Sequence, residues 1–208
     1  MEYINNRIEN EVCDDTIKRL DDTYLMPEYR ECKSVKCEIK KLEEILEKYH
    51  IETHTKNSII NDYIFQLIPP GTKGVIRGNK FNSIVKQTIM DLQLDTKRFD
   101  VCFEKQCELS ITSEIPDWYI LEKNTSRVII GMNQLDLWSG GQQLNRGYKY
   151  IINNLLNTDK TKLLCVVCNK VKISNTKNKI YKLFDVGFSN NTLCYLKNLP
   201  RIIKLFFS

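Results

Sequence analysis

Two cysteines and two histidines in the first quarter of the chain are spaced as metal ligands commonly are. Cys32 and Cys37 form a C-x4-C pair, twelve residues then precede His50, and three more precede His54. Thiolate sulfur and imidazole nitrogen are the donors that tetrahedral zinc sites use. Residues four positions apart lie on one face of a helix, so both imidazoles can reach one ion. The spacing therefore predicts a zinc site formed by these four residues.

This segment resembles a two-Cys two-His zinc finger, whose family pattern has the same ligand spacing. The stretch "HIETHTK" is similar to the end of a finger and the start of its linker. The chain departs from the family at Lys41 and Glu47, where an aromatic residue and a leucine are usual. The resemblance implies a small zinc-stabilised segment that contributes to DNA binding. The alternative is an exposed charged helix with two incidental histidines and two buried thiols.

The composition is that of a folded protein. The chain has 208 residues, of which 42% are hydrophobic and 27% are charged with both signs mixed, so it can form a core and wholesale disorder is not expected. Its formal net charge of +5 permits binding to a polyanion without requiring it.

The sequence also bears on where the protein works. No apolar run approaches the roughly 18–20 residues of a membrane span, and Met1-Glu-Tyr-Ile lacks the basic and apolar start of a signal peptide. We therefore expect an intracellular protein, in the cytoplasm or nucleus, with no membrane partner. In that setting the eight cysteines indicate metal binding or core packing, not disulfides. The pairs Cys102/Cys107 and Cys165/Cys168 lie in strand-like segments and are expected in the core.

Three regions follow from the composition along the chain. Residues 1–56 form a charged N-terminal segment that contains the Cys/His motif, and residues 57–73 read as a linker ending at Pro69-Pro70-Gly71. Residues 74–208 read as one α/β domain.

Hydrophobic periodicity places the elements of that domain. The expected order is a helix, a strand region, a two-stranded hairpin, a helix, a strand, a helix and an apolar C-terminal tail docked on the core. The ranges are Lys80–Leu94, Phe99–Thr112, Trp118–Leu121 with Arg127–Trp138, Gln142–Leu156, Lys162–Asn169, Ile180–Phe184 and Leu193–Phe207. A mixed sheet flanked by helices accounts for this order, so the predicted fold class is α/β.

The hairpin begins with Pro116-Asp117, and this order of elements resembles the PD-(D/E)xK nuclease superfamily over roughly residues 74–183. The stretch "PPGTKGVIRGNKFNSIV" is similar to the lead-in of restriction-endonuclease-like domains of large DNA viruses, which adds a virus-infected cell to the expected settings. The resemblance implies a restriction-endonuclease-like fold in which acids hold Mg²⁺ and a lysine acts on the attacking water.

Asp117 matches the first acid of that family, whereas the second motif departs from it. The chain reads Ile-Gly-Met-Asn-Gln where D/E-x-K is expected, so Gln134 stands in the lysine position and Met132 in that of the acid. Strand alternation puts Met132, Gln134 and Asp136 on one face. We therefore predict that Asp117 and Asp136 share Mg²⁺, with Glu114 as a further acid and Gln134 orienting water.

Several polar residues are candidates for contact with DNA. Gln142, Gln143 and Arg146 open the helix after the hairpin, where a helix N-terminus favours phosphate, and Arg77 precedes the first helix of the domain. The alternative is that Asp117 only caps a turn and that these polar residues form a solvated face.

The resemblances together predict a Mg²⁺-dependent DNA endonuclease with a zinc-binding, DNA-binding segment. Its catalytic residues would be Asp117, Asp136, Gln134 and Glu114, its cofactors Mg²⁺ and Zn²⁺, and its partner DNA. Two other classes stay open: a nuclease-fold DNA-binding protein without activity, because D/E-x-K is missing, and a structural or interaction protein. Whether the chain acts as a homodimer is also left open.

Overall fold

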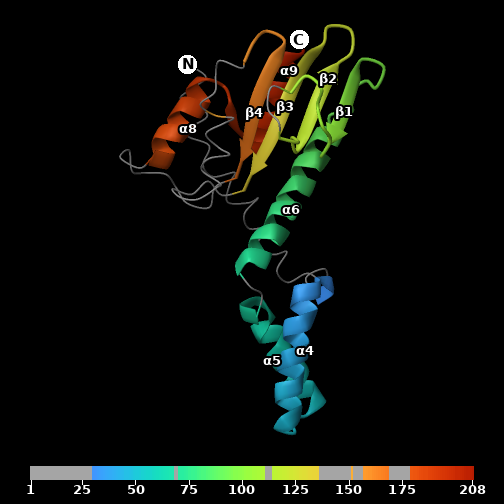
Figure 1. Cartoon of the computed structure of the whole chain (residues 1–208), viewed down its shortest axis with the longest axis vertical. Coiled ribbons are helices and arrows are strands. Elements are labelled where there is room, and N and C mark those ends of the chain that lie inside the picture. Colours follow the sequence, from blue (N-terminus) through green and yellow to red (C-terminus); the bar gives the residue numbers. More distant parts are fainter. Residues whose placement is uncertain (1–29, 68–69, 111–113, 136–150, 152–156, 169–178) are drawn as a thin grey trace. The chain divides into compact units, whose positions relative to one another are not determined.

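The chain was analysed as a computed structural model, which describes residues 30–67, 70–110, 114–135, 151, 157–168 and 179–208 (Figure 1). The described residues form two compact units, one ending at Lys80 and the other beginning at Phe81. None of the described helices has the length and apolar character needed to cross a membrane.

The N-terminal unit is helical. It contains α4 (Lys33–Lys48), α5 (Thr53–Leu67) and the first half of α6 (Pro70–Met90), with Pro70 in the first turn of α6, where a missing N–H costs nothing. A helix thus occupies much of the segment that the sequence predicted as a linker, and α6 begins ten residues before the predicted Lys80. The unit has a small core of Val35 and Ile64, and the ion pair Lys56–Glu47, at 2.6 Å, joins α5 to α4.

The second unit contains a five-stranded mixed sheet in the order β1-β2-β3-β4-β5. Its strands are β1 (Phe99–Phe103), β2 (Trp118–Glu122), β3 (Arg127–Gln134), β4 (Thr161–Val167) and β5 (Leu193–Tyr195). The first three strands form an antiparallel meander, whereas β4 is parallel to both β3 and β5. The α/β class predicted from the sequence is confirmed. The predicted helix Gln142–Leu156 lies outside the described residues except for Ile151, which is helical and buried.

Helices pack on both faces of this sheet. The second half of α6 contributes Phe81, Val85 and Ile89, which recur every four residues along one side of the helix and are all buried. On the same face, Phe207 at the end of α9 (Leu199–Phe206) packs its ring 5.0 Å from that of Phe99. The predicted docking of the apolar C-terminal tail is therefore confirmed.

The other face of the sheet is covered by α8 (Lys179–Ser189). Phe188 of α8 lies 5.3 Å from the ring of Tyr195 on β5, and Gly187 packs against Leu193. Residues Val128–Met132 of β3 are buried, in keeping with a central strand that has helices on both sides.

One close approach inside the sheet requires glycine. Gly131 on β3 is paired with Trp118 on β2, and the indole of Trp118 lies across it. A Cβ atom at position 131 would be 1.9 Å from Trp118 Cε2. Trp118 is fully buried and its Nε1 donates to Asn133 Oδ1 at 3.0 Å, so the indole has no room to move away.

An ion pair between the half-exposed Arg98 and the buried Glu122 ties the β2–β3 hairpin to the C-terminal segment. Glu122 accepts hydrogen bonds from Arg98 Nε, at 2.6 Å, and from the Thr125 hydroxyl. Arg98 also donates to the carbonyl of Phe207 at 2.7 Å, and Arg127 donates to the carbonyl of Phe206. Arg98, directly before β1, and Arg127 at the start of β3 therefore satisfy carbonyl groups at the end of α9 that have no partner within that helix.

We expect Gly131→Ala to destabilise the second unit by about 1–3 kcal/mol, because the added methyl overpacks the Trp118 indole. Gly78→Ala is the control: an added Cβ there meets nothing within 4 Å, and the site is inside α6, where alanine stabilises by up to about 1 kcal/mol. Urea unfolding followed by tryptophan fluorescence measures both. Equal stability of Gly131→Ala and the parent chain would contradict the packing described here.

The stability of the second unit should depend on pH through Glu122. The Thr125 hydroxyl and the Arg98 guanidinium lower the pKa of Glu122 below its ordinary value of 4.5, against the opposing effect of burial. Because the folded state favours the carboxylate, this stabilisation is complete above about pH 4.5 and is lost as the pH falls through the lowered pKa.

Glu122→Gln should therefore cost about 1 kcal/mol at pH 7 and should flatten the fall in the free energy of unfolding between pH 5 and pH 3. Glu108 is exposed, so the Glu108→Gln control should keep the pH dependence of the parent's stability. Urea titrations at pH 7, 5, 4 and 3 measure both variants, and parallel curves for Glu122→Gln and the parent would contradict the role of the ion pair.

Candidate metal and nucleic-acid site

The hairpin of β2 and β3 positions the first predicted acid at one end of the sheet. Asp117 directly precedes β2, and its backbone N–H donates to the carbonyl of Gly131 at 3.1 Å. One residue beyond the pair Trp118–Gly131, the register places Asp117 opposite Met132. The acid therefore belongs to the same end of the sheet as the last residues of β3.

The Asp117 carboxylate completes the hydrogen bonding of β3. Its Oδ2 accepts the backbone N–H of Asn133 at 2.6 Å, because the carbonyl of Asp117 accepts instead from the N–H of Glu104. This contact supports the alternative in which Asp117 has a structural role at a turn. A carboxylate has two oxygens and about four lone-pair positions, so the same group can also ligate a cation.

Gln134 ends β3 on the same face of the sheet as Met132. The Gln134 residue is buried, with 8% of its surface exposed. Its backbone carbonyl accepts the backbone N–H of Cys168 at 3.2 Å. Met132 is 2% exposed, and its thioether is not a ligand for a hard cation such as Mg²⁺. The structure thus brings Asp117 and Gln134 to one end of the sheet, with the buried Met132 on β3 two residues before Gln134.

The β4 strand adds a thiol beside this group. Cys165 is paired with Met132 across the parallel ladder and is fully buried. Burial raises the pKa of Cys165 well above its ordinary value, and the charges of Cys194 and Asp117 act in the same direction. Cys107, Cys165 and Cys168 are buried, as the sequence predicted, whereas Cys102 is only partly buried. A buried neutral thiol is a packing residue, not a ligand or nucleophile.

The sequence did not identify Asn133 and Asn82 as residues of this region. The Asn133 side chain accepts from Trp118 Nε1 and donates to Asn82 Oδ1 of α6 at 3.1 Å. It joins both strands of the hairpin to α6 on the face opposite Gln134. The sequence could have pointed to Asn133 through its place in the apolar strand β3, because an amide side chain that is withdrawn from water needs hydrogen-bond partners.

Other predicted residues are only partly located. Glu114 lies three residues before Asp117 in a bend and is partly buried, and Arg77 lies in the part of α6 that precedes Phe81. Asp136, Gln142, Gln143 and Arg146 lie outside the described residues. The described residues therefore supply one carboxylate and one carboxamide at the end of the sheet, which suits part of a Mg²⁺ shell that water and phosphate otherwise fill.

The predicted zinc ligands are not brought together. Cys32 is the N-cap of α4, Cys37 is within it, and His50 follows its end with a positive φ of 52°. A two-Cys two-His finger has its cysteines on a turn before the helix, whereas α4 is continuous from Lys33 to Lys48 and includes Cys37. The helix between Cys37 and Lys48 is about 17 Å long, whereas donors on one zinc ion lie within about 4 Å of each other.

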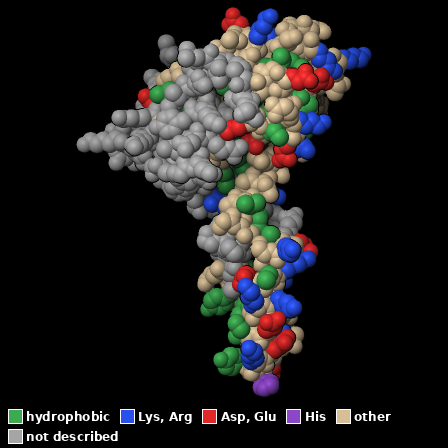
Figure 2. All heavy atoms as spheres, viewed as in Figure 1, with side chains coloured by type: hydrophobic (Ala, Val, Ile, Leu, Met, Phe, Trp, Pro, Cys, Tyr) green, Lys and Arg blue, Asp and Glu red, His purple; other side chains and the backbone are tan. Residues whose placement is uncertain are grey.

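Within the described parts of the chain, no three His, Cys, Asp or Glu side chains form a group that could hold a metal. The Cys32 thiol instead lies 3.4 Å from the Ser34 hydroxyl, which lowers the pKa of the thiol. His50 and His54 are exposed. Charged side chains of both signs are interspersed over α4 and α5 in Figure 2, in keeping with a solvated surface. Zinc binding by the four residues stays a prediction from their spacing.

Comparisons of the chain with protein-family models, with curated proteins and with solved structures found no match. The function has to be argued from the residues and their geometry.

The continuous α4 yields a third prediction. The backbone hydrogen bonds of α4 form without a bound metal ion. We therefore expect a chelator to leave the far-ultraviolet circular dichroism of the purified protein unchanged. We also expect a Cys32→Ser, His50→Asn double variant to have the same spectrum as the parent. A loss of helicity on chelation that the double variant does not show would contradict this arrangement and would support the zinc finger.

Proposed function

We propose that the protein is a Mg²⁺-dependent nuclease that hydrolyses phosphodiester bonds in DNA at the end of the sheet where Asp117 and Gln134 lie. The observation that carries the proposal is their common position: an acid directly before β2 and an amide at the end of β3, at one end of the sheet. The resemblance to PD-(D/E)xK nucleases assigns a metal-binding acid and a water-positioning residue to these two places.

The order of elements gives further support to the proposal. A helix, an antiparallel meander of three strands and a fourth strand parallel to the third are found here in sequence order within the sheet. In open α/β sheets, ligands bind beyond the carboxyl ends of parallel strands, and Gln134 ends one such strand beside β4. The net charge of +5 is compatible with a polyanionic substrate.

Each residue has a definite task in this proposal. The Asp117 carboxylate would hold the cation, while its bond to the Asn133 N–H fixes the orientation of the carboxylate. The Gln134 amide accepts a hydrogen bond from the attacking water and orients it toward the phosphorus atom. Bound Mg²⁺ would polarise the phosphate and lower the pKa of the water. Asp136 would be the second acid, and Arg146 would contact the phosphate.

A second function is favoured by a specific observation. Met132 occupies the position opposite Asp117, and the Asp117 carboxylate is already bonded to a backbone N–H. Both features fit a nuclease-like protein that binds DNA without cleaving it. Such a protein would show salt-dependent DNA affinity and no Mg²⁺-dependent cleavage.

Asp117→Asn tests the first function with little risk to the fold, because the asparagine carbonyl can still accept the Asn133 N–H. We expect Mg²⁺-dependent nicking of supercoiled plasmid to fall at least about 100-fold, since a metal-binding carboxylate supplies several kcal/mol to the reaction. The matched control is Asp91→Asn, whose carboxylate is exposed and bonded to Gln87. Asp91→Asn should cleave at the parent rate.

The measurement is the initial rate of nicking in Mg²⁺ and in chelator, with the unfolding midpoint recorded for each variant. Equal rates for Asp117→Asn and the parent would exclude Asp117 as a metal ligand. No cleavage by the parent, together with DNA binding that weakens steeply with salt, would establish the second function in place of the first.

A further inference from the structure

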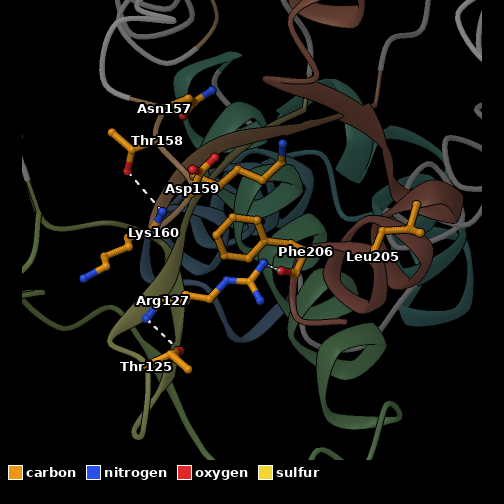
Figure 3. A pocket seen from close by; sticks show the side chains of 9 residues that line it. Thr125, Arg127, Asn157, Thr158, Asp159, Lys160, Leu205 and Phe206 are labelled. Carbon is orange, nitrogen blue, oxygen red and sulfur yellow. Dashed lines mark hydrogen bonds between the residues drawn. The ribbon is translucent and has the colours of Figure 1, made fainter.

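A cavity of about 610 Å³ lies at the opposite end of the sheet from Asp117, where β3 and β4 begin. It is formed by the β2–β3 turn, the segment leading into β4, and the end of α9 (Figure 3). A cavity of this size is in the range of small-molecule sites. The eight residues of β3 separate it from Gln134 by about 23 Å, so it is distinct from the proposed nuclease site.

The charge of the lining is predominantly positive. Arg127, Lys160 and Lys162 line the cavity, and among the described lining residues Asp159 is the one carboxylate. Lys160 and Asp159 are exposed at the rim, whereas Arg127 and Lys162 are partly buried. The more sheltered part of the lining is therefore cationic, which favours an anion.

Lys162 is the residue that most requires a ligand. It is paired with Ile129 across the β3–β4 ladder, which directs it to the face on which α9 packs. Burial lowers the pKa of Lys162, and the described residues form no ion pair with it within 4.0 Å. A cation withdrawn from water without a counter-ion is destabilising, and a bound anion would remove that cost.

Hydrogen bonds hold the lining in place before any ligand arrives. Thr158 Oγ1 accepts the backbone N–H groups of Lys160 and Thr161, and Asn157 Oδ1 accepts that of Leu163. The Arg127 guanidinium lies 4.7 Å from the centre of the Phe206 ring and donates to the Phe206 carbonyl, as Figure 3 shows. Two of its five N–H groups contact carbonyls of the C-terminal segment, which leaves others for an anion.

We propose that this cavity binds a phosphate monoester, with Lys162 as its principal charge partner and Arg127 as a second. Two sheltered cations match a dianion better than the single charge of a carboxylate. The volume exceeds that of phosphate alone, and Phe206 and Leu205 provide an apolar wall for the attached organic group. The same group is found on a free nucleotide and on the 5′ end of a nucleic acid strand.

Calorimetric titration of the full chain without Mg²⁺ tests the proposal with three probes: inorganic phosphate, deoxyadenosine monophosphate, and a short oligonucleotide with or without a 5′ phosphate. We expect saturable one-to-one binding of a phosphate probe. Lys162→Met keeps the apolar stem and removes the charge, so the variant should fold at least as stably as the parent and should bind at least about tenfold more weakly. Lys105→Met, which removes an exposed lysine outside the cavity, should bind as the parent does.

The outcomes are separable. Tighter binding of the 5′-phosphorylated oligonucleotide than of its hydroxyl form, lost in Lys162→Met, identifies a strand end as the source of the phosphate. Binding of the mononucleotide without that difference identifies a small molecule. The proposal is overturned if no phosphate probe binds saturably, or if Lys162→Met and Lys105→Met weaken binding equally. The titrations measure binding without Mg²⁺ and leave Asp117 unchanged in every variant. Their result therefore does not depend on whether the protein cleaves DNA.

Discussion

The second unit depends on β3 being a fully paired central strand. It has an antiparallel neighbour in β2 and a parallel neighbour in β4, and Val128–Met132 are buried between helices on both faces. A shift of one residue in either pairing would turn each buried side chain to the other face. Because both registers are fixed in this way, the ends of β3 have determined neighbours. Asp117 lies beside its last residues, and the segment before β4 lies beside its first.

The two ends of β3 are chemically different. At its carboxyl end lie Asp117 and the buried Gln134, and the Asp117 carboxylate accepts the backbone N–H of Asn133. At its amino end, Arg127 is held by carbonyl groups of the C-terminal segment, and Lys162 lies in the next strand. Parallel strands place their amino ends together, so cations from both strands line one cavity. The same pairing that fixes the candidate nuclease site therefore also fixes the anion site.

The Asp117–Asn133 hydrogen bond makes the functional question specific. In a protein that uses Asp117 only for structure, this bond fixes the turn before β2, and Met132 is an ordinary core residue. In a nuclease, the same bond would orient the carboxylate for a cation. The two cases share one fold and differ in what a divalent ion does to the protein. For this reason, the effect of substituting Asp117 distinguishes a nuclease from a DNA-binding protein, whereas the fold, which is the same in both cases, does not.

The sequence alone determined most elements of the sheet unit, because apolar periodicity reports which face of each segment is buried. The strands at Trp118, Arg127 and Lys162, the helix through Phe81 and the docked tail were predicted from it, whereas β5 was not distinguished from the tail. It also singled out Asp117 and Gln134 from their places in the hairpin. Tertiary structure decided what those residues contact, since the partners of Asp117 and Gln134 come from Asn133, Gly131 and Cys168, and a pattern of residue types does not specify hydrogen bonds.

Tertiary structure also decided whether the spaced cysteines and histidines lie close together. The same spacing is compatible with cysteines on a turn before a helix or with cysteines inside the helix, and only the first brings thiolates and imidazoles together. The run from Lys33 to Lys48 contains neither glycine nor proline, so the helix includes Cys37 and continues to Lys48, just before His50. The anion cavity was beyond sequence reasoning for a related reason. Its walls come from three segments far apart in the chain, and only the pairing of β3 with β4 and the packing of α9 bring them together.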